Sequence, residues 1–370
     1  MTWDVSLALW QVKGLLAREI RLYEELAAKG LEVTILSWGG AEDLQIAGLP
    51  ASIKIVPIYN YMPRPKNKAL RALASLYAAF ALRSVLQAGD VYKTNQMWGA
   101  WVAVMAKFIY RKPLILRCGF ELYDFTRRQN QGALRCAFIR FLSLISYKAA
   151  DHICVATKED SDFVHKTFGI APEKISLHPN WIDIHRFKPL DEEKKSGYVL
   201  FVGRLNAQKN LAALVKAVAK SGYTLDIVGA GELEGELKSL TATLKAKVNF
   251  LGTLPNDRLP ALYNRYPVYI LPSHYEGNPK TLLEAMACGC AVVGADAPGI
   301  ASVIAHEKTG LLCALDENAI AAALIRLMED EGLRTNLGQA ARAQIANSQS
   351  LEITVEKELA LIKRLTEKNP

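Results

Sequence analysis

The sequence lacks the short motifs that identify several common enzyme classes. It contains no C-x-x-C pair, no Walker loop and no G-x-S-x-G element, so a zinc ribbon, a P-loop nucleotidase and an α/β-hydrolase have no support. The six cysteines, at positions 118, 136, 154, 288, 290 and 313, show no metal-ligand spacing. We therefore expect reduced, mostly buried thiols and a cytoplasmic protein without a metal site.

Long apolar runs are also missing. The apolar run 72–82 lies between Arg71 and Arg83 and is well short of the roughly 20 residues that a membrane-spanning helix needs. The first residues, MTWDVSLALWQVKG, have neither the basic start nor the cleavage site of a secretory signal. We expect any membrane contact to be peripheral, on the inner face.

Positive charge is concentrated in the first half of the chain. Residues 1–188 hold 25 Lys and Arg against 16 Asp and Glu, a balance of +9, and the remainder holds 20 against 21, a balance of −1. Such an excess suits an anionic partner such as a membrane surface, a phosphorylated lipid or a nucleic acid, although it also serves solubility.

The segment TRRQNQGALRCAFIRFLSLISYKAA combines basic and apolar residues. These are Arg127, Arg128, Arg135, Arg140, Leu134, Phe138, Phe141, Leu142 and Ile145. Two interpretations stay open: contact with an anionic membrane, or a helix that packs its apolar face on a sheet and leaves its arginines in water.

Length and apolar content predict two domains. A chain of 370 residues, 51% of them apolar, exceeds the roughly 250–300 residues that one hydrophobic core usually serves. A polar stretch, KPLDEEKKSG, interrupts an alternation of apolar strands and amphipathic helices. We predict a first domain over residues 1–188, a second over 189–349, and a last helical segment over 350–370.

The alternation of strands and helices predicts parallel sheets with crossover helices. Predicted strands cover residues 5–10, 32–37, 113–117, 153–156, 198–202, 224–228, 248–251, 268–271 and 291–294. Predicted helices cover residues 16–29, 69–87, 98–110, 133–149, 210–220, 233–246, 257–265, 279–288 and 350–365. The fold class is α/β, with two doubly wound halves and a ligand site expected at the carboxyl ends of the strands, in the cleft between the halves.

The segment HYEGNPKTLLEAMACG places Glu276 and Glu284 around a predicted helix start. Asn278 is a suitable N-cap and Pro279 suits the first turn. Because a helix start attracts phosphate and Gly277 lets a ligand approach the main chain, we interpret the segment as a diphosphate seat. Its two carboxylates would accept hydrogen bonds from sugar hydroxyls. The alternative is that they only stabilise the helix dipole.

Three further motifs lie after predicted strands or at a helix start. FVGRLNAQKN brings Arg204 and Lys209 to the carboxyl end of a strand, where two cations can neutralise a leaving diphosphate, or are simply solvated. LDIVGAGELEGEL resembles a dinucleotide fingerprint, but Glu234 replaces its third glycine. The acids Asp160 and Asp162 suit either a metal or an ordinary helix start.

Taken together, these segments resemble the family-4 retaining glycosyltransferases of the GT-B fold. The likeness covers most of the chain and is strongest over residues 178–310. It rests on HPNWIDIHRFKP, FVGRLNAQKN, LDIVGAGELEGEL, LPSHYEGNPKTLLEAMACGCAVVGADAPGI and HEKTGLL. The resemblance implies two Rossmann-like domains: an N-terminal acceptor domain and a C-terminal domain for a nucleotide-diphosphate sugar. It also implies a last helix that crosses back to the first domain.

The resemblance also assigns residues to the donor site. Arg204 and Lys209 match the pair that contacts the donor diphosphate, and Glu276 matches the glutamate beside the donor sugar; these three are the predicted catalytic residues. The remaining predicted donor contacts are Gly14, Gly203, Gly229, Thr253, Leu254, Gly277, Asn278, Pro279, Thr281, Leu282 and Glu284. Among them, the N–H groups of Thr281 and Leu282 would meet the phosphate and Glu284 the ribose, with the base near residues 252–254.

Two departures from the family pattern stand in the N-terminal half. The family usually has paired glycines near the N-terminus, whereas WQVKGLLARE offers Gly14 alone. Many members have a histidine after the strand at 113–117, whereas this chain has Cys118 and Gly119. Glu121 and Asp124 are the alternative acceptor-side candidates.

The resemblance implies a metal-independent hexosyl- or N-acetylhexosaminyltransferase with no cofactor. Its expected partners are a UDP-, GDP- or other nucleotide-sugar, a glycan, lipid-linked or small-molecule acceptor, and an anionic membrane surface, but no nucleic acid. The product would belong to cell-envelope polysaccharide, glycolipid or lipid-linked glycan synthesis. The alternatives are a related enzyme that is not a transferase, such as a nucleotide-sugar epimerase or a phosphorylase, and a non-catalytic nucleotide-binding protein.

Overall fold

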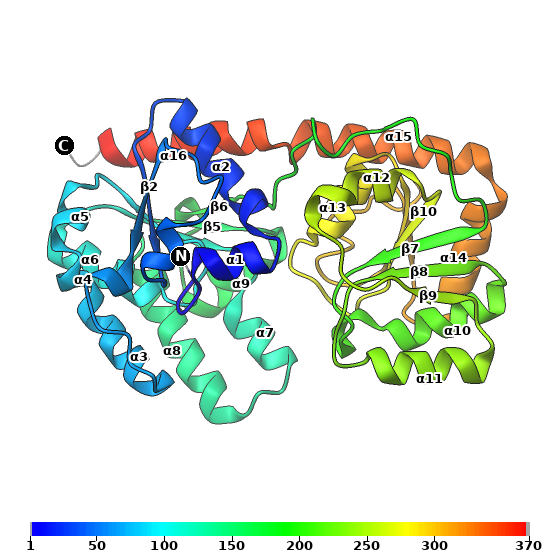
Figure 1. Cartoon of the computed structure of the whole chain (residues 1–370), viewed down its shortest axis with the longest axis horizontal. Coiled ribbons are helices and arrows are strands. Elements are labelled where there is room, and N and C mark those ends of the chain that lie inside the picture. Colours follow the sequence, from blue (N-terminus) through cyan, green and yellow to red (C-terminus); the bar gives the residue numbers. More distant parts are fainter. Residues whose placement is uncertain (1, 368–370) are drawn as a thin grey trace. The chain divides into compact units, whose positions relative to one another are not determined.

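The chain forms two compact units. The computed structural model describes residues 2–367. Unit 1 runs up to Pro179 and resumes from Val355 onward, and unit 2 comprises Asn180–Thr354 (Figure 1). The first division falls before the predicted boundary at 188/189 because the intervening residues bond to unit 2. Arg342 donates to the carbonyls of Ile184 at 3.0 Å and Phe187 at 2.8 Å.

Unit 2 contains one six-stranded parallel sheet in the order β12-β11-β10-β7-β8-β9. Its strands are β7 (Tyr198–Val202), β8 (Thr224–Val228), β9 (Val248–Phe250), β10 (Val268–Leu271), β11 (Ala291–Ala295) and β12 (Leu311–Cys313). The first strand of the unit, β7, is central, and the chain later returns to its other side with β10. This is the doubly wound order, whose switch point lies between β7 and β10.

Helices cover both faces of the unit 2 sheet. They are α10 (Leu211–Ser221), α11 (Glu234–Leu244), α12 (Leu259–Asn264), α13 (Lys280–Ala287), α14 (Glu317–Glu329) and α15 (Glu331–Ser348). In Figure 1, α10 and α11 lie below the strands, and α12, α13 and α15 lie above them. Because both faces are covered, the strands are apolar along their length: every residue of β10 and β11 is buried.

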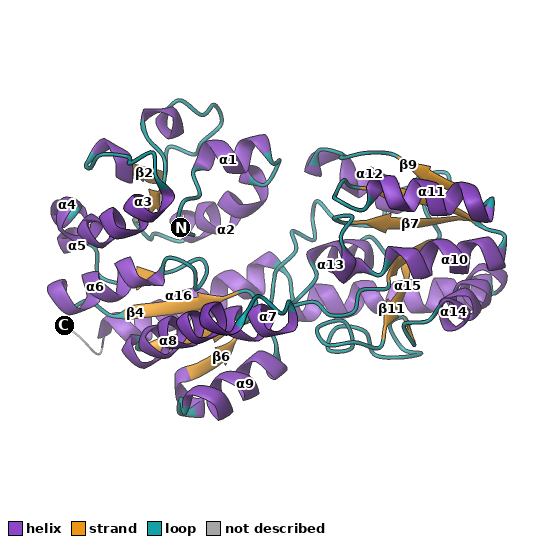
Figure 2. Cartoon of the chain, turned by 90° about the horizontal axis from the view of Figure 1, so that it is seen from below, coloured by secondary structure: helices purple, strands orange, loops and turns teal. Residues whose placement is uncertain are grey.

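The described residues of unit 1 form two separate parallel sheets. One pairs β1 (Val33–Ser37) with β2 (Ile53–Pro57), and the other has the order β3-β4-β5-β6. The second sheet comprises β3 (Tyr92–Lys93), β4 (Leu114–Cys118), β5 (His152–Val155) and β6 (Ile175–Leu177). The helices of the unit, which Figure 2 shows in purple, are α1 (Leu7–Val12), α2 (Leu16–Ala28), α3 (Lys68–Ala74), α4 (Ala78–Ala81), α5 (Arg83–Ala88), α6 (Ala100–Tyr110), α7 (Leu122–Arg128), α8 (Ala133–Ala149) and α9 (Lys158–Phe168).

The predicted strand over residues 5–10 is wrong, because this segment forms helix α1. Ser6 caps the helix by accepting a hydrogen bond from the Leu9 N–H at 3.1 Å. The buried Asp43 carboxylate accepts two more, from Leu7 at 3.1 Å and Ala8 at 2.9 Å. A carboxylate at a helix start satisfies N–H groups that have no partner within the helix.

The predicted helix over residues 69–87 is broken into α3, a 3₁₀ turn (Ser75–Tyr77), α4 and α5. At the break, the Ser75 hydroxyl donates to the Ala72 carbonyl at 2.6 Å and accepts from the Trp101 indole at 2.8 Å. A serine side chain that bonds to the main chain competes with helix continuation. The remaining predicted strands and helices correspond to elements of the same type, with small shifts at their ends.

The last helix, α16 (Leu351–Glu367), groups with unit 1 from Val355 onward. Its Leu361 and Leu365 pack with Ile115 and Cys154 of the β-sheet. The fully buried Glu358 carboxylate lies 2.7 Å from the Lys93 ammonium. Burial alone would raise the pKa of Glu358, but Lys93 and His178 outweigh it and hold the pKa at about 2. The helix is therefore attached by an apolar contact and a buried ion pair.

No helix among residues 2–367 is long and apolar enough to cross a membrane.

Candidate functional site

Two loops of unit 2 meet at the switch point of its sheet. One follows β7 and carries Arg204 and Lys209; the other follows β10 and carries Glu276. Because β7 and β10 are parallel neighbours, both loops leave the sheet at the same edge. Ligands of doubly wound sheets bind at this place.

A charged pair joins the two loops. The Lys209 ammonium donates to Glu276 Oε1 at 2.5 Å, and both side chains are largely buried, with 14% and 10% of their surface exposed. Gln208 supports the pair: its amide donates to the Tyr275 carbonyl at 2.8 Å and lies 3.4 Å from Glu276 Oε2. The structure thus brings together two of the three predicted catalytic residues. The third, Arg204, is exposed at the start of the β7 loop.

Close backbone contacts with the loop after β11 fix the position of the loop that carries Glu276. The Glu276 N–H donates to the Pro298 carbonyl at 2.9 Å. Gly299 has a φ of +78°, and a Cβ on it would lie 2.2 Å from the Glu276 carbonyl oxygen and 2.4 Å from that of Gly277. Only glycine fits there. The loop after β11 therefore sets the position of Glu276, a role that the sequence analysis did not assign to Gly299.

The loops after β7, β8 and β9 also touch one another through glycines. Gly229 has a φ of +139°, and a Cβ on it would lie 1.8 Å from the Gly203 carbonyl oxygen. The Gly229 N–H donates to the Gly252 carbonyl at 2.7 Å. Gly203, Gly229 and residues 252–254 are therefore adjacent, with Thr253 exposed and Leu254 packed on the core of unit 2.

The prediction that Asn278 caps the helix is wrong. Helix α13 begins at Lys280, with Pro279 as the N-cap residue and no side-chain acceptor for the first turn. The Asn278 Oδ1 atom instead accepts a hydrogen bond from the Asn180 N–H at 2.8 Å. Because Asn278 is occupied by residue 180, the start of α13 lacks an N-cap acceptor, and an anion can serve there.

The first turns of α13 hold Thr281, Leu282 and Glu284. The Tyr269 hydroxyl donates to Thr281 Oγ1 at 2.8 Å, and Leu282 is fully buried. Glu284 is 1% exposed and accepts from the Tyr263 hydroxyl at 3.0 Å. Burial and the Glu284 carboxylate raise the pKa of Tyr263, so this hydroxyl stays protonated and orients the carboxylate.

The acceptor-side candidates gather after β4 in unit 1. Cys118 is buried at the end of the strand, and a Cβ on Gly119 would lie 2.9 Å from the Gln96 amide. Glu121 is fully buried and accepts from the Asp124 N–H at 2.6 Å and the Tyr147 hydroxyl at 3.1 Å. Its carboxyl group therefore caps α7. Burial raises the pKa of Glu121 to about 7.

The other predicted unit 1 positions serve local structure. Asp124 is paired with Arg128 at 2.5 Å. Gly14 ends α1 with a φ of +65°, and no atom lies within 4 Å of the position that its Cβ would take. Asp160 shares hydrogen bonds with Thr157 at the start of α9, and Asp162 pairs with Lys158 one turn away. The contacts of Asp160 and Asp162 are thus those expected of acids at a helix start.

Comparisons with known proteins identify the family. Residues 20–186 match the model of Glycosyltransferase Family 4, and residues 183–344 match that of Glycosyl transferases group 1. Together the two matches span most of both units. The chain belongs to the family-4 glycosyltransferases, enzymes of the GT-B fold.

Among curated relatives, the N-acetylgalactosamine-N,N'-diacetylbacillosaminyl-diphospho-undecaprenol 4-alpha-N-acetylgalactosaminyltransferase of Campylobacter jejuni is 34% identical over 53% of this chain and 55% of its own length. The chain thus spans about half of that relative. The UDP-Gal:alpha-D-GlcNAc-diphosphoundecaprenol alpha-1,3-galactosyltransferase of Escherichia coli is 29% identical over 78% of each chain.

Among solved structures, the sucrose-phosphate synthase of Thermosynechococcus elongatus superimposes with a TM-score of 0.80 over 96% of this chain and 94% of its own, at 21% identity. At this identity the likeness concerns the fold: two Rossmann-like domains of the GT-B type.

Proposed function

We propose that the protein transfers a hexosyl or N-acetylhexosaminyl group from a nucleotide-diphosphate sugar to a hydroxyl of a lipid-linked glycan, with retention of anomeric configuration. The observation that carries the proposal is the Lys209–Glu276 pair, held at 2.5 Å beside a helix start that has no side-chain cap. A cation, a carboxylate and a helix start without a side-chain cap suit the phosphate and the sugar of one donor molecule.

The cations of the site act on the leaving diphosphate. The Thr281 N–H binds a phosphate oxygen, as helix starts do. The Leu282 N–H, which donates to the Pro279 carbonyl at 3.1 Å, shares its hydrogen with the phosphate. Lys209 and the exposed Arg204 neutralise the charge that develops as the glycosidic bond to phosphate breaks. Lys209 is fixed by its pairing with Glu276 before the donor binds, so little of its conformational freedom has to be lost in the reaction.

The two glutamates of the site bind hydroxyl groups. Glu276 faces the sugar and accepts from its hydroxyls while it holds Lys209. Glu284 is proposed to bind the ribose while it accepts a hydrogen bond from the Tyr263 hydroxyl at 3.0 Å, since one carboxylate can accept several hydrogen bonds. The residues around Gly252 lie next to Gly229, where the base would pack.

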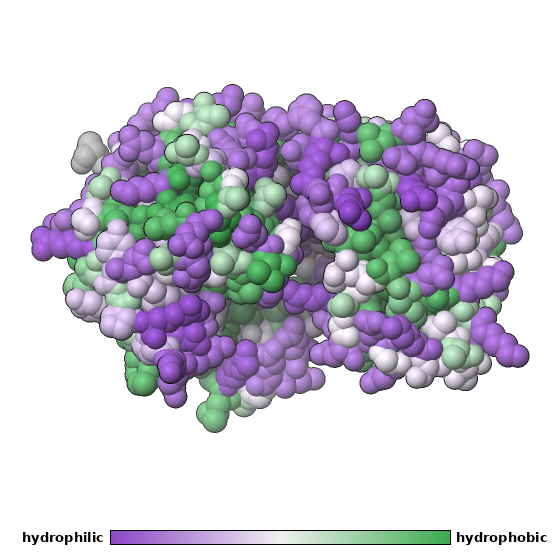
Figure 3. All heavy atoms as spheres, viewed as in Figure 1, coloured by the Kyte–Doolittle hydropathy of each residue, from purple (hydrophilic) through white to green (hydrophobic). Residues whose placement is uncertain are grey.

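The acceptor class is proposed from the two relatives and from α8. Both curated relatives are named for acceptors that carry a sugar on diphospho-undecaprenol. In α8 the apolar residues Leu134 (90%), Phe138 (54%), Phe141 (59%), Leu144 (40%) and Ile145 (43%) are exposed. Figure 3 shows hydrophobic atoms at the lower tip of this helix.

Basic residues accompany the exposed apolar face of α8. Arg135 and Arg140 on the helix, and Arg127 and Arg128 just before it, are exposed. Of the two interpretations that the sequence left open, this exposure supports contact with an anionic membrane, where such a helix buries its apolar side chains and its arginines attract lipid phosphate. We propose peripheral attachment at the cytoplasmic face, next to a lipid-linked acceptor.

Nucleotide binding tests the proposed donor site. Melting temperatures would be measured with UDP, GDP, ADP and dTDP, without divalent metal. A nucleotide at 100 times its dissociation constant adds about 2.7 kcal/mol to the free energy of unfolding, so one member of the panel should raise the melting temperature by several degrees. If none of the four shifts it, the donor-site assignment fails.

A further inference from the structure

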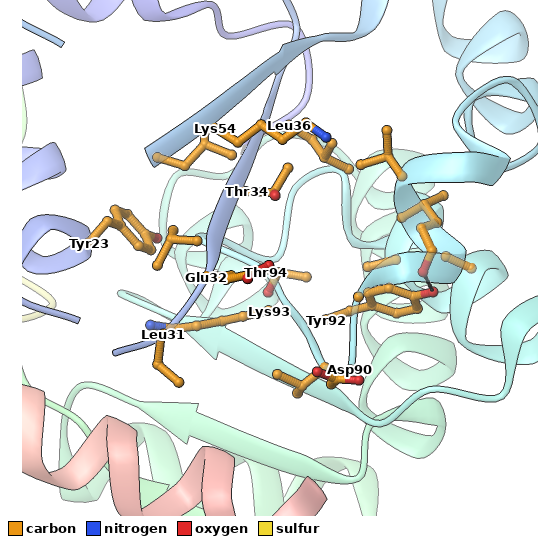
Figure 4. A pocket seen from close by; sticks show the side chains of 18 of the residues that line it. Tyr23, Leu31, Glu32, Thr34, Leu36, Lys54, Asp90, Tyr92, Lys93 and Thr94 are labelled. Atoms are coloured by element: carbon orange, nitrogen blue, oxygen red, sulfur yellow. Dashed lines mark hydrogen bonds between the residues drawn. The ribbon is translucent and has the colours of Figure 1, made fainter. Parts of the chain in front are cut away.

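Contacts within unit 2 set the position of Lys209. The cavity that Figure 4 shows has a volume of 1140 Å³, and its lining residues, among them Thr34 of β1 and Lys93 of β3, belong to unit 1. Lys209 instead ends a 3₁₀ turn (Ala207–Lys209), and Asn210 alone separates this turn from helix α10. The conformation of Asn210 therefore determines how the chain passes from Lys209 into the helix.

Asn210 has a left-handed main chain. Its φ is +52° and its ψ is +36°, whereas the 3₁₀ turn before it and α10 after it are right-handed. Residues with a Cβ rarely adopt this conformation, and asparagine adopts it more readily than most because its short polar side chain can form hydrogen bonds nearby. The chain thus changes direction directly after Lys209.

The start of a helix does not require this conformation. N-cap residues usually have an extended main chain and a side chain that accepts from the first turn. Asp316 before α14 and Asp330 before α15 follow this rule, with φ values of −82° and −106°. In the described part of the chain, the Asn210 side chain caps none of the N–H groups of α10. The left-handed conformation therefore serves the turn that carries Lys209 rather than the helix.

The Asn210 side chain bonds to a third loop instead. Its Nδ2 atom donates to the Leu315 carbonyl at 2.9 Å. Leu315 follows β12 and directly precedes Asp316, whose carboxylate caps α14 by accepting from the N–H groups of residues 318 and 319 at 3.0 Å. This bond fixes Asn210 to the loop at which α14 begins.

The chain on both sides of Asn210 is held in place. In the turn before it, the Gln208 carbonyl accepts from the His274 N–H at 2.9 Å, which joins the turn to the loop after β10. After it, Leu211 begins α10 and is buried in the core of unit 2. Because both neighbours are fixed, the main chain of Asn210 sets the angle at which Lys209 leaves the helix start.

The Lys209 side chain is confined between the two donor loops. A Cβ on Gly203 would lie 3.7 Å from Lys209 Cε, and the ammonium donates to Glu276 Oε1 at 2.5 Å. Since both the stem and the end of the lysine are in contact, a changed main chain at Asn210 would displace the ammonium group.

We propose that Asn210 is a positioning residue for sugar transfer: its left-handed main chain, supported by the bond to Leu315, holds Lys209 where the diphosphate leaves. The inference rests on the proposed function, because Asn210 acts through Lys209 and not on the substrate. Its effect falls on kcat more than on KM, since the charge of Lys209 is needed most as the bond to phosphate breaks.

Two substitutions at this position test the proposal. Asn210→Ala loses the side-chain bond and disfavours the left-handed main chain, whereas Asn210→Gly loses the bond alone. We expect the alanine variant to lower kcat by about 10-fold with KM for the nucleotide-sugar changed less than about 3-fold. The glycine variant should recover most of this loss. Wild-type kcat in the alanine variant, or a glycine variant as impaired as the alanine variant, would overturn the proposal.

Gly222→Ala is the matched control. Gly222 ends α10 with a φ of +75°, and no atom lies within 4 Å of the position that its Cβ would take. The substitution therefore strains the main chain at the other end of the same helix. It should lower the melting temperature but leave kcat unchanged. A loss of kcat as large as that of Asn210→Ala would mean that a weakened α10 is the cause, against the proposal.

A double variant shows whether Asn210 acts through Lys209. In a chain that already carries Lys209→Ala, adding Asn210→Ala is expected to cause no further loss of kcat, because the group to be positioned is absent. A further loss of about 10-fold would overturn the proposal. Full activity of Lys209→Ala alone would refute the proposed function together with this role. Impaired Lys209→Ala with fully active Asn210→Ala would refute the role of Asn210 only.

Discussion

The Lys209–Glu276 pair determines how strongly a single substitution disturbs the site. Both side chains are mostly buried, so removing one partner leaves the other charged and unpaired. Lys209 also carries the proposed neutralisation of the leaving diphosphate, which is worth more in the transition state than in the ground state.

We expect Lys209→Ala to lower kcat/KM for sugar transfer by about 10²-fold or more, and Glu276→Ala to do the same. Lys238→Ala is the matched control. This exposed lysine forms an ion pair at 2.6 Å with Glu234, one turn away on the same helix, and its removal should leave transfer unchanged. Steady-state rates with the nucleotide-sugar that the thermal panel selects are the measurement. Full activity of both site variants would refute the assigned roles.

Gly299 determines the position of Glu276 through close backbone contact. An added Cβ would meet the Glu276 carbonyl at 2.2 Å in a backbone with a φ of +78°. We expect Gly299→Ala to cost roughly 1–3 kcal/mol in unfolding free energy and to weaken nucleotide binding as the loop shifts. Gly235→Ala, on the open surface of α11 with no atom within 4 Å, should be stabilising by about 0.5–1 kcal/mol. The measurement is the free energy of unfolding of both variants in denaturant. Equal changes in the two variants would contradict the contact between Gly299 and the Glu276 loop.

At the scale of elements, the attachment of α16 to unit 1 depends on the ionised carboxylate of Glu358. The pKa of Glu358 in the folded chain is about 2, below its ordinary value of 4.5. A depressed carboxyl pKa stabilises the fold above the unfolded-state value, and this contribution is lost as the pH falls from 4.5 toward 2. Lys93, whose pKa Glu358 raises against the effect of burial, stays charged over this range.

We therefore expect Glu358→Gln to destabilise the chain at neutral pH by about 3–5 kcal/mol, the usual effect of breaking a buried pair. The difference between wild type and variant should shrink as the pH is lowered from 4.5 to 2.5. Melting temperatures over this range are the measurement, and Glu352→Gln, at an exposed position of the same helix, is the control. A difference that does not vary with pH would argue against the ion pair.

The sequence predicted elements where local pattern was sufficient. The strands β7, β8 and β10 and helix α8 were predicted residue for residue, because the short, mostly apolar strands end at a glycine or a proline and the helix begins after Gly132. The strands β2, β3, β6 and β12 were not predicted, since they are short and owe their place to pairing with neighbours. The helix at residues 7–12 was missed because its caps include Asp43, far along the chain.

The residues of the candidate site were likewise predicted from the sequence only in part. Lys209 and Glu276 could be chosen from their motifs, and the structure brings them together. The roles of Gly299 and of Asn278 could not be foreseen, because each depends on a contact with a residue distant in sequence: Glu276 for the first, Asn180 for the second. A single sequence carries no record of such pairs.

At the scale of the whole molecule, the uneven charge of the chain can be assigned to a region of the structure. The excess of basic residues lies in the half that includes α8, whose apolar residues are exposed. We expect the protein to float with vesicles that contain an anionic phospholipid and to remain unbound with neutral vesicles. The double variant Phe138→Asp and Phe141→Asp should lose this binding while keeping its nucleotide-induced thermal shift. Equal flotation of wild type and variant would exclude α8 as the contact.

The division of the chain also determines the order in which its two units can fold during synthesis. Unit 2 is continuous in sequence, from Asn180 to Thr354, whereas unit 1 needs residues from both ends. Because domains fold as units while the chain emerges from the ribosome, the part made first is the part completed last. Until Glu358, Leu361 and Leu365 have been translated, Lys93 lacks its counter-ion and Ile115 its apolar cover. A nascent chain arrested after Thr354 would therefore show a protease-resistant second unit attached to an unprotected first one.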